Sequence, residues 1–260
     1  MSDAVRRFSG VTVKDYGGIG GMKTVSIRGM GAQHTAVSYD GVTMSNVQSG
    51  QIDISRFSLE NVSMISLSIG QSDDIFQSAR SYASAGLLEV ITSNPAFKNK
   101  SYNGNIQVKA GSYGLFNPTV YYAHRLNKKF SLSLNTGWER ADGRYKFTFK
   151  NADQTEERKR RNSDVNIWRT ELNLYGSMGK AGELKFKVNY YDSERGLPGS
   201  VIFYRDDNEE RVWNKDLFSQ LYYKNKVNDK ISIKGQLKFS RNHYKYLSIT
   251  NNTAENKQED

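Results

Sequence analysis

The side chains that most often perform catalysis or bind metals are sparse in this sequence. Its histidines, His34, His124 and His243, lie far apart, and no two have the spacing of a metal site. Cysteine is absent, which excludes disulfides, thiolate metal sites and cysteine nucleophiles. Neither a Gly-x-Ser-x-Gly nucleophile motif nor a phosphate-binding glycine loop is present. We therefore expect no catalytic residue, metal site or cofactor, and we predict that the protein is not an enzyme.

The closest group of carboxylates is the run Asp206-Asp207-Asn208-Glu209-Glu210. Oxygen ligands of this kind can bind calcium, but the run lacks the glycine-containing spacing of an EF-hand loop. An acidic run of this composition is more typical of a solvated loop. We predict no calcium site there.

Composition limits how the chain could meet a membrane. Of its 260 residues, 37% are hydrophobic, and 22 are glycine against 3 proline. No run approaches the roughly 18 apolar residues that a membrane-spanning helix needs. If the chain contacts a bilayer, it must do so as strands that are apolar on one side only.

The net charge of +10 would ordinarily suggest nucleic acid or an anionic surface as a partner. However, Lys and Arg are spread through alternating strands and polar loops. The one dense run, Glu156–Arg161, contains its own acids and is typical of a solvated loop. A barrel lumen lined by Lys and Arg would explain the rest, so we predict no nucleic-acid partner.

Two apolar-rich runs, Val25–Gly31 and Ala36–Val42, flank a glycine-containing turn, and the second contains Asp40-Gly41, a pair typical of tight turns. Taken alone, they indicate a hairpin in a small β-rich domain. Together, Ile-Arg-Gly-x-Gly, the spacer and the apolar pair before Asp-Gly-Val resemble the plug domain of TonB-dependent outer-membrane receptors. The resemblance implies a structural role for Arg28, Gly29, Gly31, Asp40 and Gly41. It also predicts that Arg28 and Asp40 are buried in pairing with plug or barrel partners.

Two further segments, Tyr16–Lys23 and Ser45–Gln51, are rich in glycine or small polar residues. Such segments are ordinarily flexible loops. In the resemblance, the matching plug loops point outward and touch the substrate. The predicted ligand-binding residues are Tyr16, Gly17, Gly18, Met22, Asn46, Gln48, Ser49 and Gln51.

The rest of the predicted plug contains a strand from Val62 to Gly70 and an ending over Ser81–Thr92 that resembles the end of the family's plug. The family's Arg-Gly-Pro is replaced here by Ile69-Gly70-Gln71. Met1–Arg7 has no apolar signal segment, so either the protein is not exported or the chain is missing its beginning. Because the family's N-terminal energy-coupling segment is also lacking, we predict a plug domain over residues 1–97 that is truncated at its N-terminus. The N-terminal part of a transmembrane β-barrel, truncated at its C-terminus, follows over 98–260.

From Ser101 onward, apolar and polar residues alternate in runs of about 9–12, the length needed to cross a bilayer as tilted strands. The fold class is therefore mostly β, a mixed α/β plug followed by part of an antiparallel outer-membrane barrel. Short turns should alternate with long outer loops over Asp142–Asp164 and Arg195–Lys215. The apolar face should be convex and carry Leu184, Phe186, Val188, Ile231, Ile233 and Phe239. The seven predicted strands cover about 103–112, 117–126, 129–140, 165–177, 183–193, 216–226 and 230–247.

The resemblance implies a receptor of the vitamin B12 and siderophore type, which takes up a large scarce nutrient. Its partners would be a TonB-type energy-coupling protein, outer-membrane lipid and the nutrient ligand, in the outer membrane of a Gram-negative cell. Ser193–Gly199 is similar to a segment of Bacteroidota-type receptors, where a surface lipoprotein is a further partner. A non-transporting β-rich adhesin or carbohydrate-binding protein is the alternative. An outer-membrane protease would need an acid or histidine pair facing across the lumen, and the sequence shows none.

Overall fold

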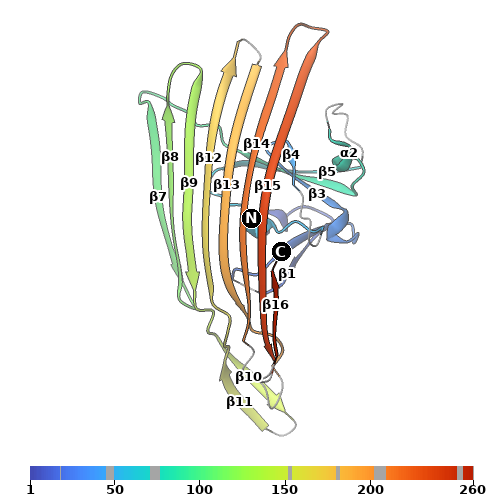
Figure 1. Cartoon of the computed structure of the whole chain (residues 1–260), viewed down its shortest axis with the longest axis vertical. Helices are drawn as coiled ribbons and strands as arrows, with labels where there is room; N and C mark the ends of the chain where they lie inside the picture. The colour runs from blue at the N-terminus through green and yellow to red at the C-terminus, as the bar shows by residue number, and fades with distance from the viewer. Residues whose placement is uncertain are drawn as a thin grey trace.

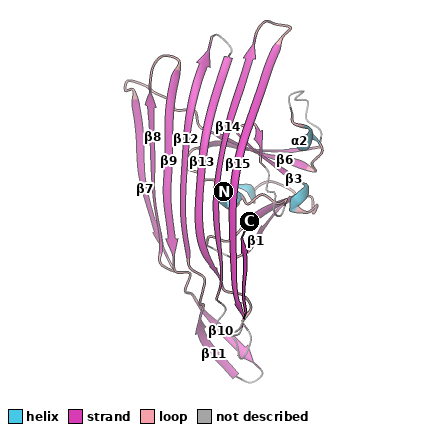
Figure 2. Ribbon diagram, viewed as in Figure 1, coloured by secondary structure: helices cyan, strands magenta, loops and turns pink. Residues whose placement is uncertain are grey.

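The computed structural model describes residues 1–17, 19–44, 50–70, 77–151, 154–179, 182–201, 209–250 and 254–259. They form two parts, an N-terminal unit of short elements up to residue 92 and a long antiparallel sheet that begins at residue 102 (Figure 1, Figure 2). The connection between them contains the predicted domain boundary at residue 97. Within the described ranges, no helix is both long enough and apolar enough to span a membrane.

The N-terminal unit begins with a short helix, α1 (Ser2–Val5), and a two-stranded antiparallel sheet of β1 (Val11–Asp15) and β2 (Lys23–Ile27). β2 ends in a tight turn, in which Arg28 and Gly29 have positive φ values of 53° and 73°. The turn is closed by a hydrogen bond from the Met30 N–H to the Ile27 carbonyl. Glycine adopts this left-handed conformation without steric cost, which explains its place in the motif.

A second sheet has the strand order β4-β3-β6-β5. β3 pairs in parallel with β6 and antiparallel with β4, so the motif's two apolar runs lie in different sheets and do not form a simple hairpin. The predicted Asp40-Gly41 turn joins β3 to β4, with φ values of 48° and 80°. The elements are β3 (Thr35–Tyr39), β4 (Val42–Thr43), β5 (Val62–Ile69), β6 (Gly86–Thr92), α2 (Ala79–Tyr82) and the 3-10 turns η1 (Ala32–His34) and η2 (Ile54–Arg56).

The long sheet has the order β16-β15-β14-β13-β12-β9-β8-β7, with every neighbouring pair antiparallel. The seven strands predicted from alternation all form, and the short β16 adds an eighth. The strands are β7 (Tyr102–Gly111), β8 (Leu115–Arg125), β9 (Phe130–Ala141), β12 (Val165–Met178), β13 (Gly182–Leu197), β14 (Glu210–Lys226), β15 (Ser232–Thr250) and β16 (Ala254–Glu259).

The connections differ at the two ends of this sheet. The predicted short turns join β8 to β9, β12 to β13 and β14 to β15 at one end, which we call the turn end. At the other end, the loop end, residues 142–164 carry a hairpin of β10 (Lys146–Asn151) and β11 (Gln154–Lys159) that extends beyond the sheet (Figure 1).

The second long loop is shorter than predicted. It covers 198–209 instead of Arg195–Lys215, because β13 continues to Leu197 and β14 begins at Glu210. Polar residues extend these strands through cross-strand ion pairs, such as Arg211 with Glu194 at 2.8 Å. Apolar alternation gives no sign of such an extension.

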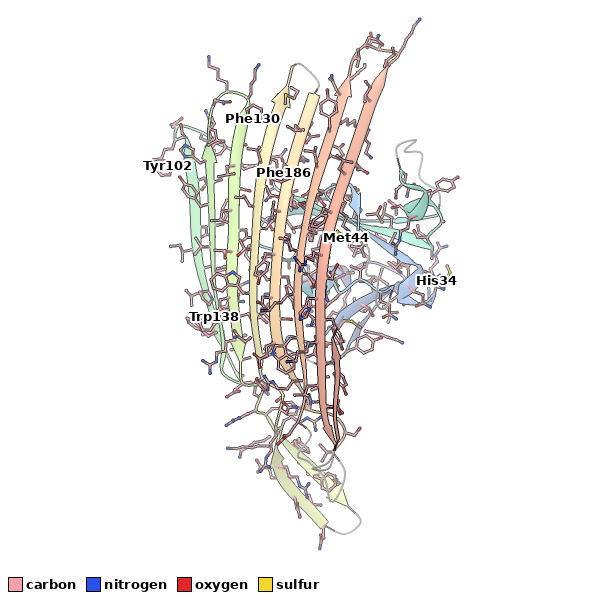
Figure 3. All side chains as sticks on the ribbon, in the orientation of Figure 1. His34, Met44, Tyr102, Phe130, Trp138 and Phe186 are labelled. Carbon is pink, nitrogen blue, oxygen red and sulfur yellow. The ribbon has the colours of Figure 1, made fainter. Side chains whose placement is uncertain are left out.

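The two faces of the long sheet differ in chemistry. The face away from the N-terminal unit carries the predicted apolar side chains, of which Phe186, Ile233 and Phe239 are 37%, 49% and 61% exposed. The N-terminal unit lies against the opposite, polar face (Figure 1, Figure 3). The strand register aligns the apolar positions into rows across the sheet, one of them being Leu132, Leu174, Phe186, Leu221 and Leu237.

The core of the N-terminal unit continues into the long sheet. Tyr39 stacks on Phe57 with ring centroids 4.8 Å apart and meets Phe218 of β14 edge to face at 6.5 Å. Aromatic pairs of this kind contribute roughly 0.5–1.5 kcal/mol beyond their buried area. The other buried members of the cluster are Val5, Val25, Val37, Ile54, Leu88 and Val90.

Candidate functional site

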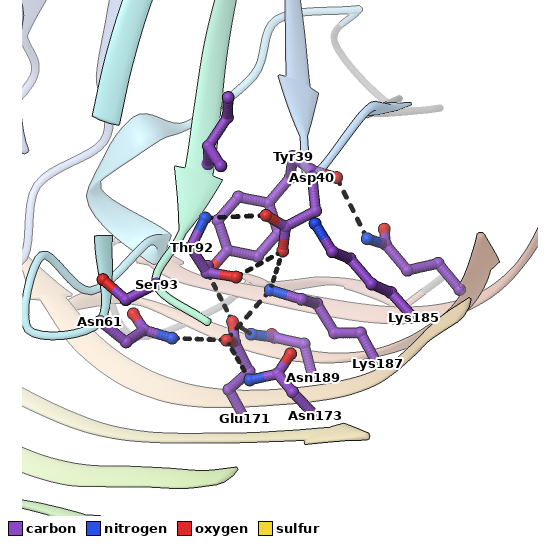
Figure 4. A network of polar contacts seen from close by, with 12 residues as sticks. Tyr39, Asp40, Asn61, Thr92, Ser93, Glu171, Asn173, Lys185, Lys187 and Asn189 are labelled. Atoms are coloured by element: carbon purple, nitrogen blue, oxygen red, sulfur yellow. Dashed lines mark hydrogen bonds and ion pairs between the residues drawn. The ribbon is translucent and has the colours of Figure 1, made fainter. Parts of the chain in front are cut away.

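A buried polar network joins the N-terminal unit to the long sheet (Figure 4). Lys187 Nζ, on β13, lies 2.6 Å from Asp40 Oδ2 and 3.0 Å from Glu171 Oε1 of β12. The side chains of Lys187, Asp40 and Glu171 are only 3%, 2% and 6% exposed. Breaking a buried ion pair costs about 3–5 kcal/mol, because it leaves an uncompensated charge in a dry site. This network therefore anchors the N-terminal unit.

Neutral donors satisfy the rest of the network. The Tyr39 hydroxyl and the Asn61 amide, both from the N-terminal unit, donate to Glu171. The Thr92 backbone N–H and hydroxyl each donate to the Asp40 carboxylate at 2.7 Å. Burial raises the pKa of Asp40, but Lys187 and the Thr92 hydrogen bonds outweigh it and hold that pKa below its usual value. Asp40 is therefore ionised at neutral pH.

The expected burial of the motif charges holds for Asp40 and is wrong for Arg28. The Arg28 side chain is exposed, because the residue occupies the first position of the tight turn after β2. Its backbone N–H donates to the Gly10 carbonyl at 2.8 Å, which continues the pairing between β2 and the chain before β1. The cation that pairs with Asp40 comes from the long sheet instead.

The Tyr16–Lys23 loop lies at the loop end of the long sheet. Ile19 packs against a buried cluster that includes Ala141 and Val165, the residues at which β9 ends and β12 begins. Gly20 has a φ of 72°, and its carbonyl accepts a hydrogen bond from Arg195 at 2.9 Å. A Cβ on Gly20 would lie 2.3 Å from Val165 Cγ2, so only glycine fits this approach.

The predicted ligand residues can be located only in part. Tyr16 is 51% exposed, next to Gly17, while Met22 and Gln51 are half-buried. The other predicted ligand residues, Gly18, Asn46, Gln48 and Ser49, lie outside the described residues.

Asp53, which the sequence did not single out, connects the bases of the two predicted loops. Its carboxylate accepts hydrogen bonds from the Lys23 N–H at 3.0 Å and the Ser55 N–H at 2.9 Å. Lys23 ends the first loop, and Asp53 follows the second within two residues of Gln51. The side chain is buried, so this link holds both loop bases together.

A cavity of about 340 Å³ lies beside the first loop, between the N-terminal unit and the loop-end half of β8, β9 and β12. Two ion pairs line it. Lys109 of the sheet pairs with Glu60 of the N-terminal unit at 2.5 Å, and Arg169 pairs with Glu139 of the neighbouring strand at 3.0 Å. Ile19, Gly20 and Lys23 line it from the loop side. This is a polar space of small-molecule size next to the predicted loop.

Comparison with known proteins identifies both parts of the chain. Residues 1–81 match the family described as the TonB-dependent Receptor Plug Domain. The FrpB iron transporter from Neisseria meningitidis is similar in structure, with a TM-score of 0.69 and 12% identity, over 95% of this chain and 38% of that one. The N-terminal unit therefore matches the plug domain of TonB-dependent receptors, and the chain has the fold of the corresponding part of such a receptor. The Ferric-Catecholate import receptor Fiu from E. coli K12 matches with a TM-score of 0.64 and 16% identity, over 95% and 37%. The Copper transporter OprC matches with 0.62 and 14%, over 100% and 46%.

The chain spans less than half the length of the solved structures that it matches. Its N-terminal unit is the plug domain, and its long sheet corresponds to part of the receptor barrel, unclosed within these residues. In outer-membrane barrels, short turns lie on the periplasmic side and long loops on the outside. By this correspondence we expect the loop end of the sheet, and with it the Tyr16–Lys23 loop, on the outer side.

Proposed function

We propose that this chain is part of an outer-membrane uptake receptor that binds a large, scarce nutrient outside the cell and imports it, energised by a TonB-type partner. The observation that carries the proposal is the contrast between the two faces of the long sheet. The plug is anchored to one face by buried ion pairs, while the other face presents an apolar band.

The dimensions of this band support a membrane location. Rows on one face are two residues apart, about 6.7 Å along a strand. Four rows, from that of Leu184 to that of Tyr190, rise roughly 20 Å before side chains are added, close to the ~25 Å apolar band of outer-membrane barrels. On β9, β12, β13 and β14 these rows contain no Asp, Glu, Lys or Arg. A soluble adhesin or carbohydrate-binding protein would expose this band to water.

The ligand site in this proposal consists of the two outward plug loops and the adjoining cavity. Tyr16 offers an exposed aromatic face, Met22 a soft apolar group, and Asn46, Gln48 and Gln51 amide groups to a large polar ligand. Solved relatives are described as an iron transporter, a ferric-catecholate receptor and a copper transporter. These descriptions favour a metal complex such as a siderophore, or a molecule of similar size such as cobalamin.

The test is uptake by the full-length receptor in its own cells. Radiolabelled ferric catecholate, ferric hydroxamate, ferric citrate and cyanocobalamin would be supplied singly to wild-type, receptor-deletion and TonB-deletion strains. We expect one of them to accumulate in wild-type cells and in neither deletion strain. Uptake that is unchanged by both deletions, together with a purified receptor that is soluble without detergent, would refute transport and support the adhesin.

The plug-loop assignment needs a separate measurement on the nutrient so identified. We expect the double substitution Tyr16→Ala and Asn46→Ala to lower affinity at least tenfold while the free energy of unfolding of the receptor is unchanged within about 0.5 kcal/mol, as is usual for surface substitutions. Arg28→Ala provides the control, since this side chain is also exposed on the plug but lies outside both loops. If the double variant binds as wild type while deletion of residues 142–164 abolishes binding, the plug loops only gate the path.

A further inference from the structure

Lysines are concentrated on the inward face of the sheet near its turn end. Lys224 of β14 lies directly opposite Lys234 of β15, and Lys185 of β13 lies opposite Tyr222 in the next row. The row after that contains Lys187 and Lys238. We call Lys185, Lys224, Lys234 and Lys238 the lysine track.

The track carries an excess of positive charge. In these three rows of β12 to β15, Glu183 is the one carboxylate at a described inward position, and it pairs with Lys185 at 2.8 Å. Lys185 and Lys234 both lie over the Tyr222 ring, with Nζ 5.9 Å and 5.8 Å from its centroid. Like charges directly opposite one another destabilise a sheet. The opposed pair Lys224 and Lys234 therefore adds positive charge at a point where Lys185 already lies over the same ring.

Described plug residues contact two of the three rows of the track. Gln236 of β15 donates to the Gly41 carbonyl of the β3–β4 turn, and the Lys238 ammonium contacts Met44 Sδ at 3.9 Å. Gln236 lies in the row of Lys185, and the row of Lys224 and Lys234 follows it toward the turn end. Lys187, the plug anchor, lies in the row at which the plug contact and the track meet.

We propose that the lysine track is a binding path for an anion, and that the nutrient imported by this receptor carries net negative charge. This inference rests on the proposed uptake function and adds its substrate class. A groove lined by one sign of charge with low-dielectric walls concentrates ligands of the opposite sign. Aligned lysines provide this attraction without binding tightly at any single point, which suits a ligand that must pass through.

The charge of the track can be measured without any nutrient. Ser232 is exposed and inward, two residues before Lys234, and the chain contains no cysteine. Ser232→Cys, in a full-length receptor free of other cysteines, would be reacted with sulfonate-bearing and trimethylammonium-bearing methanethiosulfonates. A local potential of one kT changes the ratio of the two rates by about sevenfold, because it acts oppositely on the two reagents. We expect the anionic reagent to be favoured by at least that factor relative to a free thiol.

Charge removal provides the comparison. The triple variant Lys185→Gln, Lys224→Gln and Lys234→Gln, which we call the track variant, should return the rate ratio to that of a free thiol. Salt at ~1 M should do the same, because it screens charge interactions beyond about 3 Å. The control triple, Lys215→Gln, Arg241→Gln and Lys245→Gln, removes as many cations from the outward face and should leave the ratio unchanged. Equal ratios in wild type and the track variant would overturn the proposal.

Uptake tests the substrate class separately. We expect the identified nutrient to be anionic, such as a ferric catecholate, and its uptake to fall at least fivefold in the track variant while its affinity at the outer surface is unchanged. A neutral nutrient such as cyanocobalamin, or unchanged uptake, would overturn the assignment. If no probe is imported at all, the uptake function fails and the substrate class with it, whereas the labelling ratio still decides whether the track attracts anions.

Discussion

Replacing Lys187 with methionine tests how the plug is held in the barrel. Methionine keeps most of the apolar stem and removes the ammonium, which leaves Asp40 and Glu171 as two buried carboxylates without their shared cation. Loss of one partner of a buried pair costs about 3–5 kcal/mol. The exposure of these side chains, 6% or less, justifies the full range without a discount for solvent screening. The equilibrium for local opening of the plug should rise by roughly 150- to 5,000-fold.

Hydrogen exchange of β3 and β6 amides in the detergent-solubilised full-length receptor measures this opening, because both strands lie at the anchor. The matched control is Lys215→Met on the outward face, whose pair with Asp192 at 3.7 Å is partly exposed and should contribute less than about 1 kcal/mol. Adding Asp40→Asn to the Lys187 variant should restore part of the protection, since it removes one unpaired charge. Unchanged exchange in Lys187→Met, or equal acceleration in the control, would refute the anchoring role.

Two further predictions concern the plug. The pKa of Asp40 in the folded plug is held below its usual value, so its ion pair stabilises the plug at pH values above the usual carboxyl pKa. This stabilisation is lost as pH falls through the lowered pKa. Hydrogen exchange of β3 amides should therefore accelerate below about pH 4, and Asp40→Asn should weaken that dependence on pH. Gly20→Ala should destabilise the docked loop by about 1–3 kcal/mol through the clash with Val165, measured by urea unfolding of the plug. Gly29→Ala, also in the plug at a φ of 73° but with nothing within 4 Å, carries only the backbone cost, so equal losses in the two would contradict the steric argument.

The strands of the long sheet could be predicted because alternation repeats on each of them, and a row such as Leu132, Leu174 and Phe186 requires every strand to present the same face. The strand ends could not be predicted in the same way. Beyond the apolar band the pattern fades, and ion pairs such as Arg211 with Glu194 continue the pairing, so both ends of the loop predicted over Arg195–Lys215 are strand.

The site was predictable only where the backbone constrains the residue type. Asp40-Gly41 is recognisable because its turn needs positive φ, and Asp40 is buried as expected. Its partner Lys187 looks like any other inward lysine of an alternating strand, and nothing in the sequence distinguishes it from Lys185. Arg28 was assigned to burial by its place in the motif, but a side chain in the first position of this turn points to solvent.

Lys187 connects the anchor to the lysine track, and the connection has a consequence for the proposed transport. While the plug is seated, the ammonium is neutralised by Asp40 and Glu171. When the plug moves, Asp40 leaves with it, whereas Glu171 remains on β12 beside Lys187. The net positive charge beside the lysine track then increases, because the Asp40 carboxylate no longer faces Lys187 in the row of Lys238. An anionic nutrient would therefore meet its strongest attraction only after the plug has been displaced, which favours passage toward the turn end over premature binding beneath a closed plug.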